Sequence, residues 1–228
     1  PTIAIPSDVT STLTVLSVLD CKDPERVRID VVGTTNFTVK TTSVTSISDV
    51  NSGVNSFVEI DLPASGDYLF EVVDNAGGCT YPLPKHHVDE PVKPTVAINE
   101  AKPVTCFGAV DGELNITVGD YTGQYDYDVL MVDQAGTETS VKTGTFDTAN
   151  NPETITGLAG GNYIVRVTSQ GNPFCSAPSN VATVRAPLAA LDITSNEVGN
   201  VSCTDDTGKI VANATGGWDQ SPYEYQLP

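Results

Sequence analysis

One pattern occurs three times in this 228-residue chain. Each copy has a cysteine, a short polar turn and an alternating strand that ends at glycine, and the copies cover residues 18–33, 103–120 and 200–217. The cysteines recur at intervals of 106 − 21 = 85 and 203 − 106 = 97 residues. This interval is close to the size of one immunoglobulin-like sandwich, ~100 residues. We therefore expect consecutive small domains instead of one large core.

Two further sets of similar stretches give the same spacing. "LPASGDYLFEVVDNAGGC" at 62–79 aligns with "LAGGNYIVRVTSQGNPFC" at 158–175, and "DEPVKPTVAI" at 89–98 aligns with "RAPLAALDI" at 185–193. We expect two complete repeats, 1–93 and 94–187, and a partial third repeat, 188–228. A domain does not end halfway through its strands, and the chain starts at proline, so we expect an excised segment of a longer protein.

Within each repeat, apolar residues alternate with polar ones. "ELNITV" places Leu114, Ile116 and Val118 on one face, and "RVRIDVV" and "YIVRV" follow the same period. A period of two is typical of strands with one buried face and one solvated face. Gly, Asn, Asp and Pro interrupt these runs at short intervals, and no helical periodicity is present. The sequence therefore predicts an all-β fold of tandem immunoglobulin-like antiparallel β-sandwiches.

The charge excludes several classes of partner. The formal net charge is −18 and the pI is about 4.1. Binding of nucleic acid or of an anionic membrane surface requires clustered Lys and Arg, so neither partner is expected. No apolar run approaches the ~20 residues of a membrane helix, so no membrane insertion is expected of this segment.

Two tyrosines follow a glycine turn at the start of a late strand. Tyr68 lies in "LPASGDY" and Tyr163 in "LAGGNY". This arrangement is typical of the tyrosine corner of Greek-key sandwiches. We expect each hydroxyl to fold back onto the preceding backbone while the ring joins the core.

The five cysteines indicate disulfides. Each complete repeat carries two, and an even count in a secreted chain is typical of a disulfide framework. The count favours one bond within each repeat, Cys21–Cys79 and Cys106–Cys175, with the partner of Cys203 missing. In an immunoglobulin-like path, however, the two cysteines of a repeat lie at opposite ends of the sandwich. The alternative is therefore Cys21–Cys175, which leaves Cys79, Cys106 and Cys203 unpaired.

The stretch "CFGAVDG" at 106–112 raises the question of a metal site. Asp111, Asp205 and Asp206 lie in equivalent turns and are weak calcium candidates, but calcium requires six to eight oxygen ligands. Turn formation by Asp-Gly explains them better. The histidines are His86 and His87, which as neighbours on a strand point to opposite faces. We expect no metal and no cofactor.

Three aromatic residues are candidates for stacking against sugars. Trp218, Tyr121 and Tyr223 lie in or beside the loops that follow the repeated strand. Core packing is the competing interpretation, since Tyr223 also begins the next strand.

No motif of an enzyme is present. The sequence contains no G-x-S-x-G, no H-E-x-x-H and no P-loop. A hydrolase built from two acidic residues remains the weakest of the hypotheses. We therefore expect no catalytic residues.

"VTCFGAVDGELNITVGDYTGQYDYDV", followed by "LAGGNYIVRVTSQGNPFC", resembles the SprB-type repeat. The third copy adds the Gly-Gly and Pro-Tyr-x-Tyr elements of that family in "GGWDQSPYEYQL", whereas the first copy has "CKDPERV" in place of Cys-Phe-Gly. The resemblance implies a non-catalytic stalk or adhesive module of a long Bacteroidota surface adhesin of the gliding type. It implies export by the type IX system to the cell surface. Its partners would be neighbouring repeats of the same chain, surface polysaccharide or other surface proteins.

The same resemblance marks one possible modification site. "DTA" at 147–149 fits the Asp-Ser/Thr-aliphatic motif on which Bacteroidota attach O-glycans. Thr148 would carry the sugar.

Overall fold

The computed structural model describes residues 9–42, 47–53, 55–199, 203, 208–218, 223–224 and 226. These residues group into two compact units. Unit 1 takes its residues from 1–93 together with 169–176, and unit 2 takes its residues from 94–168 and 177–228. Among the described residues the only helical element is the short 3-10 helix η1 (Thr148–Asn150), and no helix has the length and apolarity needed to cross a membrane.

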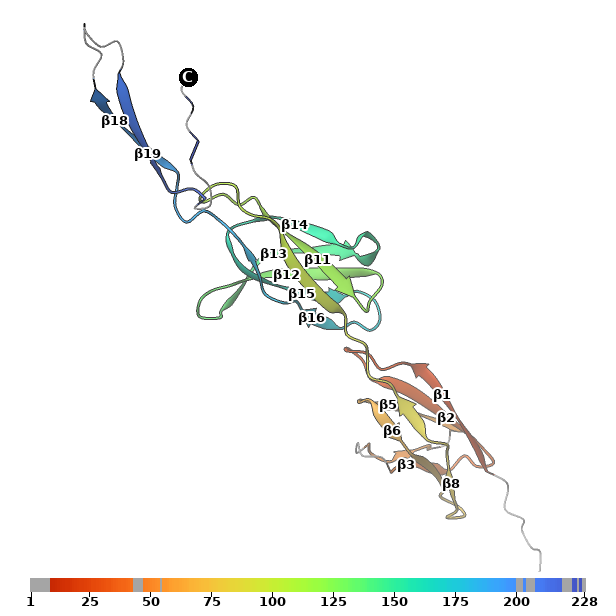
Figure 1. The fold of residues 1–228 in the computed structure, drawn as a ribbon. Coiled ribbons are helices and arrows are strands. Elements are labelled where there is room, and N and C mark those ends of the chain that lie inside the picture. Colours follow the sequence, from red (N-terminus) through yellow and green to blue (C-terminus); the bar gives the residue numbers. More distant parts are fainter. Residues whose placement is uncertain are drawn as a thin grey trace, which may run out of the picture. The chain divides into compact units, whose positions relative to one another are not determined.

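Unit 1 is built from antiparallel sheets (Figure 1). One sheet has the order β1-β2-β5, a second has the order β4-β3-β7-β8, and β6 pairs with β9. The strands are β1 (Thr10–Ser17), β2 (Glu25–Val32), β3 (Phe37–Thr41), β4 (Val50–Asn51), β5 (Phe57–Leu62), β6 (Gly66–Tyr68), β7 (Phe70–Asp74), β8 (Thr80–Pro82) and β9 (His86–Val88).

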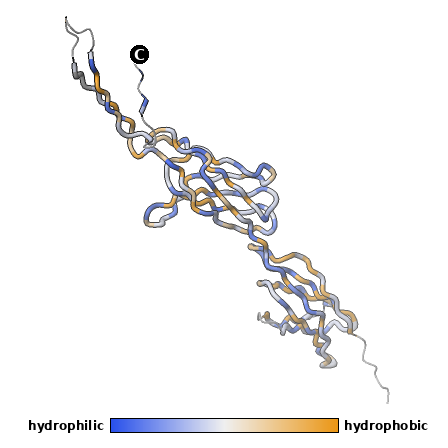
Figure 2. Tube along the Cα trace, in the orientation of Figure 1, coloured by the Kyte–Doolittle hydropathy of each residue, from blue (hydrophilic) through white to orange (hydrophobic). Residues whose placement is uncertain are grey.

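The core of unit 1 follows from the alternation in its strands. Val27, Ile29 and Val31 of β2 are fully or almost fully buried, whereas Arg28 and Asp30 lie on the other face and form an ion pair of 2.7 Å. The colours of hydrophobic and hydrophilic residues accordingly alternate along the strands in Figure 2. Because inward-facing residues of both sheets meet, the sandwich has one continuous apolar core.

Unit 2 repeats this arrangement. Its sheets have the orders β10-β11-β14 and β13-β12-β15-β16, with β17 also paired to β15, and a separate hairpin is formed by β18 and β19. The strands are β10 (Thr95–Lys102), β11 (Gly112–Gly119), β12 (Gln124–Val132), β13 (Glu138–Asp147), β14 (Glu153–Leu158), β15 (Gly161–Ser169), β16 (Ser176–Pro178), β17 (Ala182–Val184), β18 (Asp192–Gly199) and β19 (Lys209–Thr215).

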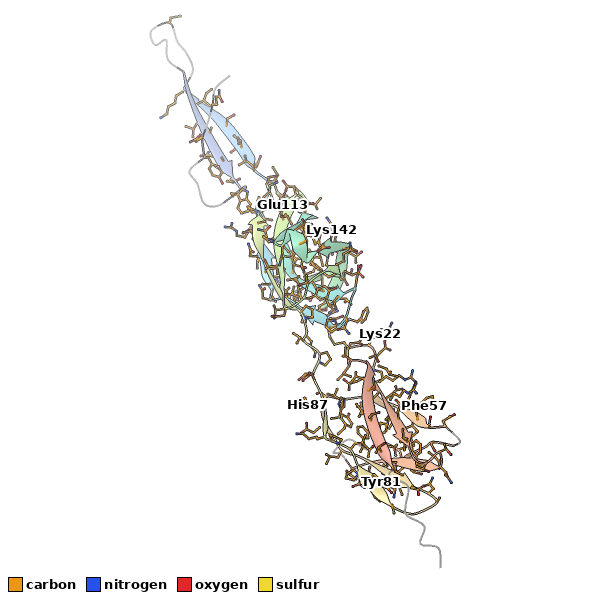
Figure 3. The ribbon with its side chains drawn as sticks, turned by 90° about the vertical axis from the view of Figure 1, so that its right-hand side faces the viewer. Lys22, Phe57, Tyr81, His87, Glu113 and Lys142 are labelled. Carbon is orange, nitrogen blue, oxygen red and sulfur yellow. A yellow bond between two sulfur atoms is a disulfide. The ribbon has the colours of Figure 1, made fainter. Side chains whose placement is uncertain are left out.

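The core of unit 2 lies between its two larger sheets. Leu114 and Ile116 of β11 and Val165 of β15 are completely buried there. The side chains drawn in Figure 3 fill the space between the strands of each sandwich. The predicted all-β fold of antiparallel immunoglobulin-like sandwiches is therefore confirmed.

Candidate functional site

The turn between the first two strands of each repeat carries a cysteine at a fixed position. We call these the first-hairpin turns: residues 18–24, residues 103–111 and, in the third repeat, the link between β18 and β19, of which Cys203 and Gly208 are described. In all three hairpins the strand register shifts just before the turn. The three cysteines are therefore equivalent, each placed four residues after the last paired residue of the first strand: Ser17 and Cys21, Lys102 and Cys106, Gly199 and Cys203.

A second pair of equivalent cysteines lies in the turns that follow β7 and β15. We call these the last-hairpin turns: residues 75–79 and 170–175. The backbone N–H of the strand's last residue donates to the cysteine carbonyl in both turns, at 2.9 Å for Cys79 and 3.0 Å for Cys175. The residue before each cysteine has a positive φ, 70° at Gly78 and 52° at Phe174. Cys79 and Cys175 thus each close the turn and lie just before the next strand, β8 or β16, although the turn of Cys175 is one residue longer.

A disulfide joins one cysteine of each kind. Cys21 and Cys175 are bonded, with an S–S distance of 1.98 Å and a Cα–Cα distance of 5.0 Å. The N–H of Cys21 donates to the carbonyl of Pro173 at 2.9 Å, and the Lys22 ammonium, labelled in Figure 3, lies 5.7 Å from the ring centroid of Phe174. The bond thus connects the first-hairpin turn of the first repeat to a last-hairpin turn that belongs, by sequence, to the second.

The preferred pairing within each repeat, Cys21–Cys79 and Cys106–Cys175, was therefore wrong, and the alternative Cys21–Cys175 is present. Cys79, Cys106 and Cys203 are unpaired and exposed. The reason is geometric. β5 ends beside the start of β2, next to the Cys21 turn, and the chain then runs along β6 and β7 before it reaches Cys79. Residues 66–74 cover about 25 Å at strand rise, far more than the ~7 Å a disulfide can bridge.

An open apolar pocket lies beside Cys106, within unit 2. Its volume is about 550 Å³. The indole N–H of Trp218 donates to the carbonyl of Thr105 at 3.2 Å, and the Tyr223 hydroxyl donates to the carbonyl of Gly216 at 2.6 Å. The lining residues are Thr105, Cys106, Phe107, Pro187, Ala190, Leu191, Gly217, Trp218, Tyr223 and Glu224.

Gly216 allows the backbone to approach closely beneath this pocket. Its φ is +78°, and a Cβ atom at this position would lie 2.0 Å from the carbonyl oxygen of Ala190. Only glycine fits there. The next residue, Gly217, donates its N–H to the carbonyl of Ala189 at 3.0 Å. The Gly-Gly pair therefore positions the chain that carries Trp218.

Two of the three candidate aromatic residues for sugar stacking come together in this pocket. Trp218 and Tyr223 are 36% and 37% exposed. Tyr121 does not line the pocket. Its ring packs against the core of unit 2, and its hydroxyl donates to the carbonyl of Gln124 at 2.9 Å. Sequence reasoning missed Phe107, which is 56% exposed at the same pocket.

The acidic turn residue Asp111 is engaged within its own turn. Its carboxylate accepts hydrogen bonds from the N–H of Thr105 at 2.9 Å and from the Thr105 hydroxyl at 2.6 Å, and the Lys102 ammonium lies at 3.5 Å. The bonds from Thr105, followed by the charge of Lys102, lower the pKa of Asp111. Asp205 and Asp206 lie outside the described residues. Within the described part of the chain, no three His, Cys, Asp or Glu side chains converge as metal ligands would.

Both tyrosine-corner residues have the geometry that this motif requires. The hydroxyl of Tyr68 donates to the carbonyl of Ala64 at 2.8 Å, and that of Tyr163 donates to the carbonyl of Ala159 at 2.9 Å. Both rings are buried, and burial raises the pKa of Tyr163. Both hydroxyl groups are therefore engaged in hydrogen bonds to their own backbone.

The candidate glycosylation residue lies in η1. Thr148 is half-buried, and its hydroxyl oxygen accepts a hydrogen bond from the N–H of Gly123 at 2.9 Å. O-glycosylation of Thr148 stays a prediction.

Sequence reasoning also missed a buried contact between a carboxylate and an imidazole in unit 1. Glu25 is 5% exposed and contacts His86 through its carboxylate. The equivalent positions in unit 2 hold Gly112 and Ala182. Glu25 and Gly112 each pair with the last leucine of the neighbouring strand, β5 or β14. His86 and Ala182 each pair with a corner tyrosine. A Cβ atom on Gly112 would lie 2.5 Å from Val184. The alternation of the strand was the available signal, because Glu25 lies two residues before Val27 and therefore on the same, inward-facing side.

Comparison with known proteins identifies the repeat. Residues 98–131 and 195–227 match the SprB repeat, and no curated protein matches. The chain is a tandem of antiparallel β-sandwiches and contains a SprB-type repeat region.

Several solved structures are similar to the chain. Fibronectin(III)-like modules of Clostridium thermocellum CbhA are 16% identical, covering 78% of this chain and 95% of that one, with a TM-score of 0.29. Latent PorU from Porphyromonas gingivalis is 15% identical, covering 80% of this chain and 20% of that one, with a TM-score of 0.31. A tetra-tandem repeat from the extending region of a large adhesion protein is 14% identical, covering 92% and 63%, with a TM-score of 0.29.

Proposed function

We propose that this chain is a non-catalytic repeat segment of a long cell-surface adhesin of Bacteroidota, serving as a stalk or adhesive module in surface attachment or gliding. The observation that carries the proposal is the double match to the SprB repeat, whose two starts lie 195 − 98 = 97 residues apart. A binding module needs one copy of its site. A chain that repeats the same kind of sandwich at intervals of 85–97 residues lengthens the protein and presents the same surface several times.

Two physical properties support this role. The net charge of −18 makes neighbouring chains repel one another, which favours solubility and spacing at a crowded surface. The disulfide Cys21–Cys175 requires an oxidising compartment to persist, as found outside the cytoplasm. Export by the type IX system and location at the outer surface belong to the same proposal.

The test is exposure on intact cells. An antibody raised against this chain should label unpermeabilised cells of the native source, and brief treatment with a protease should remove the label. A periplasmic protein serves as the control that stays protected. A chain detected only after permeabilisation would contradict the proposal.

Carbohydrate binding is the second candidate function. The observation in its favour is the pocket beside Cys106, where Trp218 and Tyr223 offer partly exposed rings over a largely apolar floor. Sugars stack on such rings. Surface polysaccharide is the ligand class of this candidate.

A glycan array separates the two candidates. If the pocket binds sugar, Trp218→Ala abolishes binding, whereas Tyr121→Ala, which changes an aromatic residue outside the pocket, leaves it intact. Equal binding by both variants, or no binding by the parent chain, would rule out this candidate. Neither result affects the surface-exposure test.

A further inference from the structure

The chain contains two kinds of cysteine, and the structure shows how they combine. Cys21, Cys106 and Cys203 are first-hairpin cysteines, each four residues beyond the last paired residue of the hairpin's first strand. Cys79 and Cys175 are last-hairpin cysteines; in both turns the cysteine carbonyl accepts from the last residue of the strand and the residue before the cysteine has a positive φ. The observed disulfide joins one of each kind.

The exposed thiols repeat both halves of this bond. Cys106 is equivalent to Cys21, and Cys79 lies in the turn of the first repeat that corresponds to the turn of Cys175. Each is exposed and unpaired. The turn that presents Cys106 also exposes Phe107 (56%) and Val110 (63%). This apolar surface would be covered when another turn reaches the sulfur.

We propose that Cys106 and Cys79 are the two complementary halves of a second disulfide junction, in which the first-hairpin turn at 103–111 receives a last-hairpin turn from another copy of this repeat. The occupant of the Cys106 turn is thus a turn of the 75–79 kind. A second copy of this chain supplies one through its Cys79. This inference rests on the Cys21–Cys175 bond and the shared registers, and it goes beyond the proposed surface role.

The bond forms by oxidation of two thiols. One Sγ–Sγ bond forms, two S–H bonds are lost, and the two protons and two electrons pass to a small-molecule disulfide such as oxidised glutathione, which is reduced to two thiols. Because the contact is heterologous, with one kind of turn on one copy and the other kind on the next, it can continue from copy to copy without closing.

The pairing rule is tested with two variants of the full chain. One variant keeps only Cys79 of the unpaired thiols (C106S/C203S), and the other keeps only Cys106 (C79S/C203S). Both retain Cys21 and Cys175. Equal amounts are mixed in a glutathione redox buffer at moderate salt, which screens the repulsion between the acidic chains. The disulfide-linked dimers are then identified by mass and by non-reducing peptide mapping.

Docking of the two turns predicts that the ratio of Cys79–Cys106 heterodimers to each homodimer rises about tenfold, from the statistical 2:1 to about 20:1, which requires only about 1.4 kcal/mol of preference. The same mixture in urea should return to the statistical ratio, because urea unfolds the turns whose docking creates the preference. A statistical ratio under native conditions would overturn the proposal. So would a native mixture that yields only glutathione adducts, or homodimers in excess.

Discussion

The Cys21–Cys175 bond sets how far the chain can be stretched. It encloses 154 of the 228 residues, and these cannot extend under load while the bond is intact. The remaining 228 − 154 = 74 residues extend to roughly 250 Å at about 3.3–3.6 Å per residue, whereas the complete chain would reach roughly 790 Å. We expect reduction of the bond to release roughly 510–550 Å in one step.

Single-molecule force spectroscopy with handles at both ends measures this length directly. The chain is unfolded in the absence of reductant, held at constant force, and then exposed to a dithiol. The matched control is the double variant C21S/C175S, which should reach full length without reductant.

The competing pairing gives a different record. Bonds Cys21–Cys79 and Cys106–Cys175 would enclose 58 and 69 residues and would release roughly 200 Å and roughly 240 Å in two separate steps. Two such steps, or full extension of the parent chain without reductant, would refute the assignment of the bond.

Three further predictions concern the interior. Tyr68→Phe and Tyr163→Phe each remove a buried hydrogen bond and should lower the free energy of unfolding, measured by urea titration, by about 1–2 kcal/mol. Tyr125→Phe is the control: because the Tyr125 hydroxyl has no partner among the described residues, this change should lower the free energy of unfolding little or raise it. Glu25→Gly or His86→Ala alone leaves a buried polar group without its partner and should cost about 1–3 kcal/mol, and the double variant, which introduces the residue pair found in unit 2, should cost clearly less than their sum. Burial, with smaller contributions from nearby carboxylates, raises the pKa of Tyr125 to about 12, so its tyrosinate absorbance should appear last in an alkaline titration. Because an unfolded tyrosine ionises near pH 10, stability should fall between pH 10 and 12; early titration of all eight tyrosines would contradict this.

The parts of the fold that depend on local pattern could be predicted from the sequence. The alternation in "ELNITV" is sufficient for a half-buried strand, and Leu114 and Ile116 are indeed buried in β11. The glycine turn before Tyr163 lies within a few residues of the carbonyl that its hydroxyl reaches. Short spacing made both features readable without a structure.

Features that depend on distant segments could not be predicted in this way. Glu25 and His86 are 61 residues apart, and nothing near either residue marks the other as its partner. The pocket beside Cys106 draws residues from three separate segments, so the aromatic pattern alone could not assign Tyr121 to one place and Trp218 to another.

The cysteine pairing shows why a count is a weak guide to connectivity. Two cysteines per repeat fit a bond within the repeat, and they fit equally well a bond from each repeat to the next, because both schemes use one cysteine of each kind per repeat. The schemes differ only in which strand ends meet. Cys21 and Cys79 follow strands that end at opposite ends of one sandwich, so the even count cannot be satisfied inside the repeat. The stretch "CFGAVDG" therefore carries its chemistry at Cys106, as a thiol positioned for a turn of another repeat, while Asp111 and Gly112 shape the turn that presents it.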